Sequence, residues 1–348
     1  MSDRGPLRIV PVDPADAEAF DRWYDAYLAA ERAVGPDVCS PWAREELRVM
    51  LAGGGSRRWT GAFAGLLGDR VVAAGRVETP LLDNLATGLV AVHVDPAHGR
   101  RGYATAMLHH LEEVARGRGR TVLVAEALWP HDAGPTGDGM AGPDFLRAHG
   151  YELVLGNEKR ILRLPVVDGR LAELAAGAAA HHPAYTLRTV AGPVPDDLVD
   201  GLAALASTLM TEAPMGERQL EAERITAAEL REDEELMRRQ GRTKYTTVAL
   251  DASGAVVAYT DLAVTVHEPG RAYQWGTLVR PGDRGHRLGL AVKVANLRLL
   301  QRESPESTVL VTFNADSNEP MIAVNDLLGF EPTARLGELQ KRLRSDEN

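Results

Sequence analysis

Two short stretches of the sequence place basic side chains and glycine directly before a predicted helix. They read VHVDPAHGRRGYATAML, from Val92 to Leu108, and TLVRPGDRGHRLGLAVK, from Thr277 to Lys293. In each, an apolar strand pattern ends at a proline-containing turn, and a helical pattern begins a few residues later. The first N–H groups of a helix lack partners and lie at the positive end of its dipole, so both stretches predict a pyrophosphate site.

Two common phosphate-binding motifs do not fit these stretches. The chain has no G-x-x-x-x-G-K-[ST] sequence, which excludes the phosphate loop of an NTPase. No G-x-G-x-x-G follows a first strand with an acidic residue about 20 positions on, which argues against a dinucleotide-binding fold.

An internal repeat relates the two stretches. Val94 and Pro96 correspond to Val279 and Pro281, an offset of 185 residues, and VVA at 71–73 recurs with the same offset at 256–258. TVLV at 121–124 recurs at 308–311, and LRIV at 7–10 recurs as LRTV at 187–190. Because the matches keep one order and nearly one offset, they indicate two copies of one domain.

We predict that residues 1–165 and 185–348 form the two domains, joined by an alanine-rich linker with a short helix at 166–184. Each copy has early strands, a fourth strand that ends at the basic turn, a long helix, a buried strand, a short helix and a Gly-aromatic pair. Early antiparallel strands followed by a strand–helix–strand crossover predict a mixed α/β (α+β) fold, with a largely antiparallel sheet flanked by helices.

Length and composition limit the class of protein. A chain of 348 residues with 45% hydrophobic and 25% charged residues is typical of a two-domain soluble globular protein. The net charge of −10 argues against a nucleic-acid partner. Abundant arginine and alanine indicate a bacterial genome.

Other features of the sequence concern location and metals. Cys39 is the single cysteine, which fits a reducing compartment. The sequence shows no signal peptide and no apolar run of the ~18 residues that a membrane span needs, so we expect a cytoplasmic protein without a membrane partner. No His, Cys or carboxylate cluster has metal-ligand spacing, so we predict no metal.

Both stretches resemble the acetyl-coenzyme A loop of the GCN5-related N-acetyltransferases (GNATs), V-x-V-x-P followed by Q/R-x-x-G-x-G/A at a helix start. The first copy matches at Val92, Val94, Pro96 and residues 99–104, and the second at Thr277, Val279, Pro281 and residues 284–289. Since the resemblance runs through both halves, the chain is similar to tandem bacterial GNATs, the form that includes mycothiol synthase. The resemblance implies a splayed fourth strand that pairs with the pantetheine of acetyl-coenzyme A, the cosubstrate.

The resemblance also implies a set of coenzyme-binding residues in each copy. They are Val92, Val94, Arg100, Arg101, Gly102, Tyr103 and Ala104 in the first copy, and Leu278, Val279, Arg284, Gly285, His286, Arg287, Leu288, Gly289, Asn314 and Asn318 in the second. Each copy departs from the family pattern. Gly99 stands where Gln or Arg is usual, and Arg287 stands where glycine is usual, so its side chain would either bind phosphate or crowd the loop.

The family often places a tyrosine, as the acid, four residues before the Gly-aromatic pair, where this chain has Leu146 and Asn325. Its base often lies on the fourth strand, where the first copy has Gly88-Leu89-Val90 and the second has Tyr273-Gln274-Trp275. The second copy is the more polar at both places. We therefore predict that chemistry takes place in the C-terminal domain, with Asn325 and Tyr273 as catalytic residues.

The predicted function is an acetyl-coenzyme A-dependent N-acetyltransferase that acts on a small amine, as a monomer or homodimer. A non-catalytic acyl-coenzyme A-binding sensor or scaffold is the alternative, because both copies lack the usual tyrosine. The acceptor site is expected along Thr211–Gln240, with Ala213-Pro214-Met215-Gly216 as a substrate-facing turn. The acidic residues there either attract an amine or form the solvated face of a helix.

Overall fold

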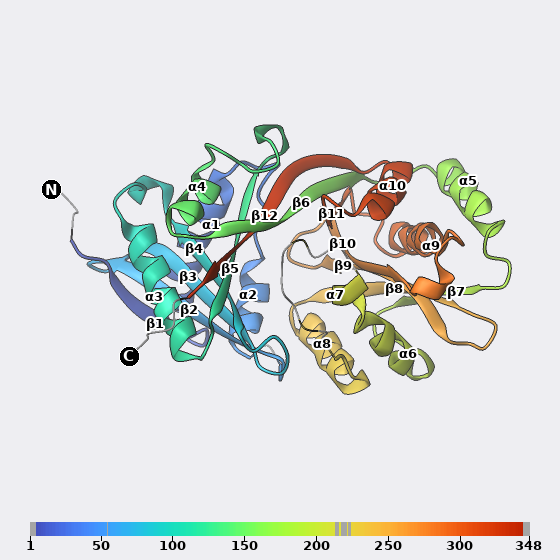
Figure 1. Ribbon diagram of the computed structural model, residues 1–348, viewed down its shortest axis with the longest axis horizontal. Helices are drawn as coiled ribbons and strands as arrows, with labels where there is room; N and C mark the ends of the chain where they lie inside the picture. Colours follow the sequence, from blue (N-terminus) through green and yellow to red (C-terminus); the bar gives the residue numbers. More distant parts are fainter. Residues whose placement is uncertain (1–4, 54, 213–215, 217–220, 222–223, 344–348) are drawn as a thin grey trace. The chain divides into compact units, whose positions relative to one another are not determined.

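The computed structural model describes residues 5–53, 55–212, 216, 221 and 224–343. It divides into two compact units, which we call unit 1 (residues 1–156 and 334–348) and unit 2 (residues 157–333). Figure 1 labels their helices and strands. Among the described residues, no helix combines the length and the apolar character that crossing a bilayer requires.

Unit 1 is built on a sheet with the strand order β1-β2-β3-β4-β5-β12. Neighbouring strands are antiparallel except β4 and β5, which are parallel and are joined through α3. This confirms the predicted strand–helix–strand crossover. The elements are β1 (Arg8–Val12), α1 (Ala17–Ala33), α2 (Arg44–Leu51), β2 (Arg58–Leu67), β3 (Arg70–Pro80), β4 (Thr87–Val94), α3 (Tyr103–Gly117), β5 (Val122–Pro130), α4 (Ala141–Ala148) and β12 (Glu331–Arg342), the last from Ala334 on.

Unit 2 repeats this plan with the strand order β6-β11-β10-β9-β8-β7. Its parallel pair is β10 and β11, joined through α9. The elements are β6 (Glu152–Arg163), which belongs to unit 2 from Asn157 on, α5 (Asp168–Ala179), β7 (Thr186–Ala191), α6 (Asp196–Ala206), α7 (Leu209–Glu212), α8 (Ala227–Arg239), β8 (Arg242–Leu250), β9 (Val256–Thr265), β10 (Arg271–Val279), α9 (Leu288–Glu303), β11 (Val309–Ala315) and α10 (Glu319–Leu328).

The last strand of each sheet comes from the other copy of the sequence repeat. In unit 1, β12 pairs with β5 over Ala334–Arg342, and in unit 2, β6 pairs with β11 over Asn157–Arg163. The division of the structure therefore differs from the boundaries expected at 165 and 185. Both strands follow a Gly-aromatic pair, so the repeat does not specify which of two similar sheets each strand joins.

Helices α1 and α3 cover opposite faces of the unit 1 sheet. Ala74 of β3 packs in the cluster that includes α1, whereas its neighbour Ala73 packs in the cluster that includes α3. Successive strand residues point to opposite faces, so the side chains of β4 also alternate between the two helices. The buried aromatic face of α1 has helical spacing and consists of Phe20, Trp23, Tyr24 and Tyr27.

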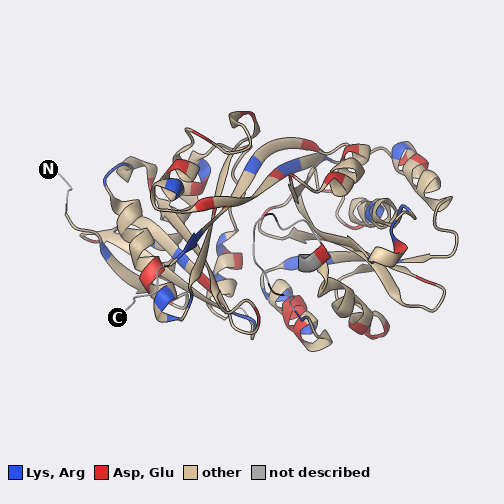
Figure 2. Cartoon of the chain, viewed as in Figure 1, with Lys and Arg blue, Asp and Glu red and all other residues tan. Residues whose placement is uncertain are grey.

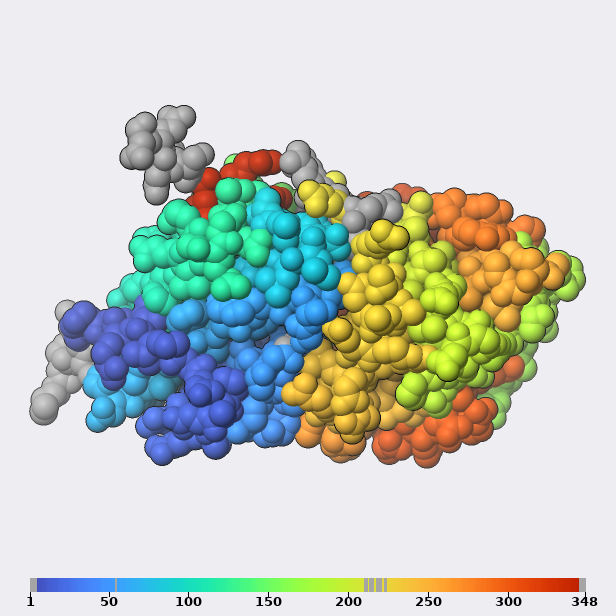
Figure 3. Space-filling model, turned by 90° about the horizontal axis from the view of Figure 1, so that it is seen from below, coloured from blue at the N-terminus to red at the C-terminus, as the bar shows by residue number. Residues whose placement is uncertain are grey.

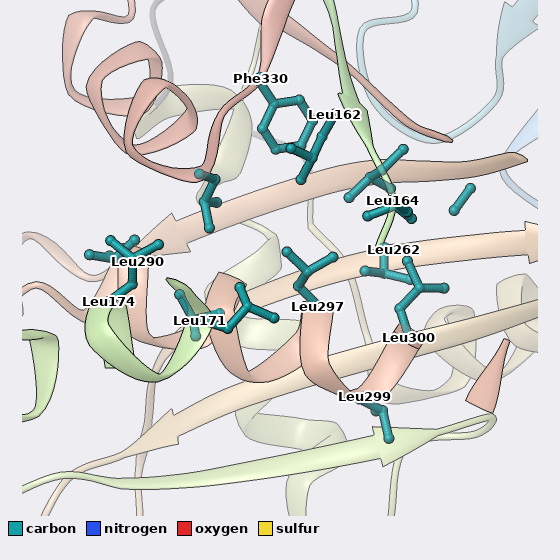
Figure 4. Packing of buried hydrophobic residues seen from close by; sticks show 14 of the residues in the cluster. Leu162, Leu164, Leu171, Leu174, Leu262, Leu290, Leu297, Leu299, Leu300 and Phe330 are labelled. Atoms are coloured by element: carbon teal, nitrogen blue, oxygen red, sulfur yellow. The ribbon is translucent and has the colours of Figure 1, made fainter. Parts of the chain in front are cut away.

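Helix α9 lies in the centre of the unit 2 core, where ten of its sixteen residues are buried. A helix buried on so many sides needs cover away from the sheet. Leu171, Leu174 and Ala178 of α5 join the same cluster as Leu297 and Leu300 of α9 (Figure 4). The alanine-rich segment predicted as a linker thus contributes a helix to this core.

Candidate functional site

The parallel strands β4 and β5 of unit 1 separate along their length. They pair only where Thr87–Leu89 lie beside Val122–Val124, whereas β4 continues to Val94 with antiparallel partners in β3. Along residues 90–94, the backbone groups that face β5 have no ladder partner in that strand. A cavity of about 280 Å³ lies here, lined by residues of α1, β4, β5 and α4. The predicted splay of the fourth strand is therefore present in unit 1.

The turn after β4 contains two residues in the left-handed conformation. Arg100 has a φ of 59° and Gly102 a φ of 83°, and α3 begins directly after Gly102. Left-handed residues in such turns let backbone N–H groups converge into a concavity that binds anions. Together with the start of α3, the turn has the shape that a pyrophosphate requires.

A carboxylate at the end of β4 fixes this turn. Asp95 accepts a hydrogen bond from the N–H of Ala97 at 2.9 Å and pairs with Arg70 at 3.1 Å. Burial opposes its ionisation, but the Ala97 N–H and the charges of His98 and Arg70 outweigh burial and hold the pKa of Asp95 below its ordinary value. An ionised Asp95 therefore holds the turn through the Ala97 backbone and through Arg70 of β3.

The coenzyme-binding residues predicted in unit 1 lie together at this strand end and turn. Val92 and Val94 line the cavity. Arg100 and Arg101 are exposed, and Arg100 has no side-chain partner among the residues that the structure describes. Tyr103 is 7% exposed and packs with Leu67 and Val72, so its ring anchors the start of α3. Gly102 precedes α3, and Ala104 lies in its first turn.

The cavity also holds a histidine–carboxylate pair that the sequence analysis missed. Nε2 of His93 on β4 lies 2.9 Å from Oε1 of Glu31 on α1. The His93 ring packs edge-on against Tyr27, with ring centroids 4.8 Å apart. The side chains of His93 and Glu31 are 17% and 18% exposed. A polar residue between two apolar strand positions was the available signal for His93, whereas no local pattern relates it to Glu31.

The strands β10 and β11 of unit 2 also separate. They pair where Arg271–Tyr273 lie beside Val309–Val311, and β10 continues to Val279. Unlike β4, β10 has an irregularity between Gln274 and Thr277, where the register with β9 shifts by one residue. Such a bulge bends a strand and leaves an extra residue unpaired.

The turn after β10 has the same backbone plan as the turn after β4. Gly285 and Arg287 have φ values of 88° and 54°, and they correspond to Arg100 and Gly102 at the repeat offset. Glycine and arginine have exchanged places, while both positions stay left-handed in both turns. The sequence departure at Arg287 therefore does not change the conformation of the turn.

The basic side chains of this second turn contact their own chain. Arg284 pairs with Glu212 of α7 at 2.7 Å. Nδ1 of His286 lies 3.1 Å from the carbonyl oxygen of His181, and Arg287 donates to the carbonyl oxygen of Gly177 in α5 at 3.4 Å. Each of these three basic side chains thus already has an acceptor in the protein, and their predicted role in anion binding stays a prediction.

The splay of unit 2 contains a buried polar chain. Lys293 of α9 donates to Oδ1 of Asn325 at 2.9 Å, and Asn325 donates to Oδ1 of Asn314 at 2.6 Å. Burial lowers the pKa of Lys293 to about 7. Asn325 is 0% exposed. The repeat places Leu108, which lines the unit 1 cavity, at the position of Lys293, so unit 2 has a polar contact where unit 1 has an apolar wall.

The other residues predicted in unit 2 have separate contacts. The Tyr273 hydroxyl donates to Glu268, and burial with this carboxylate raises the pKa of Tyr273. The side chain of Asn318 accepts from the N–H of Met321 and caps α10. Leu278 and Leu288 are buried in the core, whereas Val279 and Gly289 are half-buried at the strand end and helix start.

The segment expected to form the acceptor site is only partly described. Ala213, Pro214 and Met215 of the expected substrate-facing turn lie outside the described residues. Helix α8, which lies at the surface of unit 2 in Figure 3, carries five acidic and three basic residues (Figure 2). Arg231 pairs with Glu234 and Arg238 pairs with Glu235, each at 2.6 Å. Two of the acidic residues are thus paired within the helix, and α8 keeps an excess of acidic side chains.

An acyl-coenzyme A fits the groups that unit 1 presents. The unpaired edge of β4 offers backbone partners, the cavity has room for a thioester, and the turn at α3 offers N–H groups and two exposed arginines. A metal ion would need a different set of ligands. In the described part of the chain, no group of three or more His, Cys, Asp or Glu residues has the geometry of a metal site.

Comparisons with known proteins agree with this geometry. A family model described as "Acetyltransferase (GNAT) family" matches residues 20–129, in unit 1. No curated protein matches the chain in sequence. A tandem GNAT protein from the clavulanic acid biosynthesis pathway is similar in structure, with 27% identity and a TM-score of 0.79 over 98% of this chain and 100% of that one.

Two further solved structures share the fold at lower identity. A GCN5-related N-acetyltransferase from Sphaerobacter thermophilus has a TM-score of 0.62 at 16% identity, over 98% of this chain and 97% of that one. Saccharomyces cerevisiae N-myristoyltransferase, solved with myristoyl-CoA, has a TM-score of 0.59 at 11% identity, over 97% and 79%. Acyl-coenzyme A is the cosubstrate of this family, and the predicted fold is confirmed. Residues 20–129 thus match the GCN5-related N-acetyltransferase (GNAT) family, and the chain over its full length is similar in structure to a tandem GNAT protein.

Proposed function

We propose that the protein transfers an acetyl group from acetyl-coenzyme A to an amine of a small molecule, and that this chemistry takes place in unit 1. The observation that carries the proposal is the cavity where β4 leaves β5, directly before a turn whose arginines are exposed. A thioester arm that enters between the strands would end in this cavity. Its pyrophosphate would lie at the start of α3.

The residues of unit 1 have separate roles in this proposal. The backbone of Val92 and Val94 pairs with the pantetheine as an added strand would. The N–H groups at the start of α3 bind the pyrophosphate, and Arg100 and Arg101 add charge-assisted contacts. Bound in this way, acetyl-coenzyme A supplies an activated acyl carbon, and the protein supplies its position and the proton acceptor for the amine.

The sequence favours the second copy as the catalytic one, and unit 2 is the second candidate site. Its support is the bulge in β10, because an unpaired N–H at a bulge is a donor for a developing oxyanion. The roles predicted for Asn325 and Tyr273 depend on this alternative. We favour unit 1 because Lys293 and Asn325 contact each other at the positions that correspond to the apolar cavity wall of unit 1, and because the basic side chains of the second turn already have acceptors.

Three further features of the predicted function remain part of this proposal. The acceptor is a small amine, the location is the cytoplasm, and the protein acts as a monomer or homodimer. A non-catalytic acyl-coenzyme A sensor is the competing function, because Leu146 offers no proton where the family often has a tyrosine.

Calorimetry with acetyl-coenzyme A and a thiol-release assay over a panel of small amines test the proposal together. We expect saturable binding and release of free coenzyme A that depends on at least one amine. Binding without amine-dependent release would instead support the sensor. Failure of acetyl-coenzyme A to bind would contradict both functions.

A further inference from the structure

We propose that His93 is the catalytic base of the acetyl transfer and that Glu31 is its positioning residue. The inference rests on the proposed function of unit 1 and assigns the proton acceptor that this function requires. An amine attacks a thioester only in its neutral form, and a free amine with a pKa of about 10 is mostly protonated at neutral pH.

The contacts of the imidazole leave one nitrogen for this task. Nε2 lies 2.9 Å from Oε1 of Glu31, so Nε2 carries the proton that this carboxylate accepts. Nδ1 then has the free lone pair, and it has no hydrogen-bond partner among the described residues. The edge-on contact with Tyr27 restricts rotation of the ring. A base held by a second group is the arrangement that general-base catalysis uses.

The place of His93 in the strand puts it beside the thioester. Val92 and Val94, on either side of it, lie in the separated part of β4. Their side chains pack toward the cluster that includes α3, so the side chain of His93 points to the other face, where α1 lies. His93 and Glu31 both line the cavity.

Other titratable groups that face this cavity are less suited to accept a proton. Burial raises the pKa of Tyr27, whose hydroxyl oxygen accepts the Trp42 N–H. Arg76 of β3 pairs with Glu78 at 3.3 Å and is a cation. Glu126 of β5 lines the cavity and is exposed. Of these groups, His93 is the one that presents an imidazole nitrogen with a lone pair to the cavity.

The step balances without another reactant. The amine nitrogen bonds to the acyl carbon, and the bond between that carbon and sulfur breaks. His93 Nδ1 takes the proton that the nitrogen loses and returns it to the departing sulfur. The products are the amide and free coenzyme A thiol, and His93 ends in its starting state.

The test compares wild-type protein with His93→Gln and Glu31→Gln, using acetyl-coenzyme A and the amine found by thiol release. We expect His93→Gln to lower kcat about 100-fold or more while the acetyl-coenzyme A Kd stays within about twofold. Glu31→Gln should lower kcat by roughly tenfold, because the ring loses its orientation. His109→Gln, an exposed position of α3 that does not line the cavity, is the matched control.

Two further readouts separate a base from a structural residue. The fall of kcat/KM toward acidic pH should be present in wild-type protein and absent in His93→Gln. Hydroxylamine, which is largely neutral at neutral pH, should be acetylated with a much smaller loss in His93→Gln than an ordinary amine.

Three results would overturn the assignment. A His93→Gln variant with wild-type kcat and an unchanged pH profile would contradict it while the proposed function stands. A loss of acetyl-coenzyme A binding that matches the loss of kcat would make His93 a binding or folding residue. Wild-type protein that neither binds nor cleaves acetyl-coenzyme A would instead remove the proposed function, and the inference with it.

Discussion

The turns that follow β4 and β10 have the same backbone and different neighbours. Both hold two left-handed residues before a helix, at positions that the repeat relates. In unit 1, Arg100 has no side-chain partner among the described residues. In unit 2, Glu212 and two backbone carbonyl groups accept from the three basic side chains. The loop motif therefore predicts the conformation of the backbone. The contacts of its basic side chains with the rest of the protein determine whether they are available to an anion.

The side chains beside the separating strands also differ between the two units. Leu108 and Leu146 line the unit 1 cavity, whereas unit 2 has Lys293 and Asn325 at the corresponding positions, in contact with each other. An apolar wall suits a thioester arm, whereas the buried amine and amide of unit 2 satisfy each other. The two copies thus keep one fold with different capacities for a ligand.

The largest effect that we predict comes from ending the chain after Thr333. This change removes β12 from β5 and takes the fully buried Leu339 out of the unit 1 core, together with the ion pair between Lys341 and Glu112. Although residues 1–156 stay intact, unit 1 should lose its fold and its acetyl-coenzyme A binding. Hydrogen exchange should show deprotected β2–β5 and protected β8–β11.

Leu339→Met is the control for this truncation, since it keeps the strand and nearly the same volume. It should retain exchange protection in both units. If the truncated chain kept β2–β5 protected, unit 1 would fold from its own half of the repeat, as the sequence boundaries at 165 and 185 suggest.

This strand exchange marks the limit of what the repeat predicts. The offset of 185 residues located the fourth strand, the turn and the helix in both units, because each is specified by local pattern. Strand partners depend on the tertiary fold, and two sheets of the same plan accept the same kind of strand. For that reason the elements were predictable and the composition of the two units was not.

The candidate site was predictable to a similar extent. Val92, Val94 and residues 100–104 follow from a motif within one segment, and the structure brings them to one strand end. The pairing of His93 with Glu31 joins β4 to α1 across a sheet face, which no local spacing encodes. The contacts of Arg284 and Arg287 likewise come from α7 and α5.

The second prediction concerns the two pairs of arginines. Arg100→Ala with Arg101→Ala should weaken acetyl-coenzyme A binding by at least about tenfold to a hundredfold, since the loss of even one charge-assisted phosphate contact costs roughly 1.5–3 kcal/mol. Arg284→Ala with Arg287→Ala should leave the Kd within about twofold, because these side chains already contact Glu212 and Gly177. Calorimetry of both double variants measures the contrast. The opposite outcome would assign coenzyme binding to unit 2.

The third prediction uses the buried amine of unit 2. The pKa of Lys293 is about 7 in the folded protein, against 10.5 in the unfolded chain, so between these values the unfolded state binds one proton more. The free energy of unfolding should therefore rise with pH in this window, by about 1.4 kcal/mol per pH unit from this group. Lys293→Leu, which copies the residue at the related position of unit 1, should remove that slope.

Urea unfolding of both proteins at several pH values above neutrality measures this difference. Arg298→Leu, an exposed basic residue of the same helix, is the control and should keep the wild-type slope. Equal slopes in wild-type protein and Lys293→Leu would show that Lys293 is charged in the folded state. A buried charged amine would then need an opposite charge near Asn325 to stabilise it.

The smallest predicted effect comes from giving the second turn the glycine of the first. Arg287 adopts a φ of 54°, which costs a residue with a Cβ about 1–2 kcal/mol, whereas glycine adopts it without strain. Against this gain, Arg287→Gly makes the unfolded chain more flexible and removes a 3.4 Å contact with the Gly177 carbonyl at an exposed site. The net change should raise the free energy of unfolding by about 0.5–1 kcal/mol, measured by urea unfolding.

Arg100→Gly tests the same strain in unit 1 and should also stabilise the protein, because Arg100 has a φ of 59° and no side-chain partner among the described residues. If Arg287→Gly destabilised the protein while Arg100→Gly stabilised it, the contact with α5 would contribute more than the strain costs, and α5 would act as a fixed cover of the second turn.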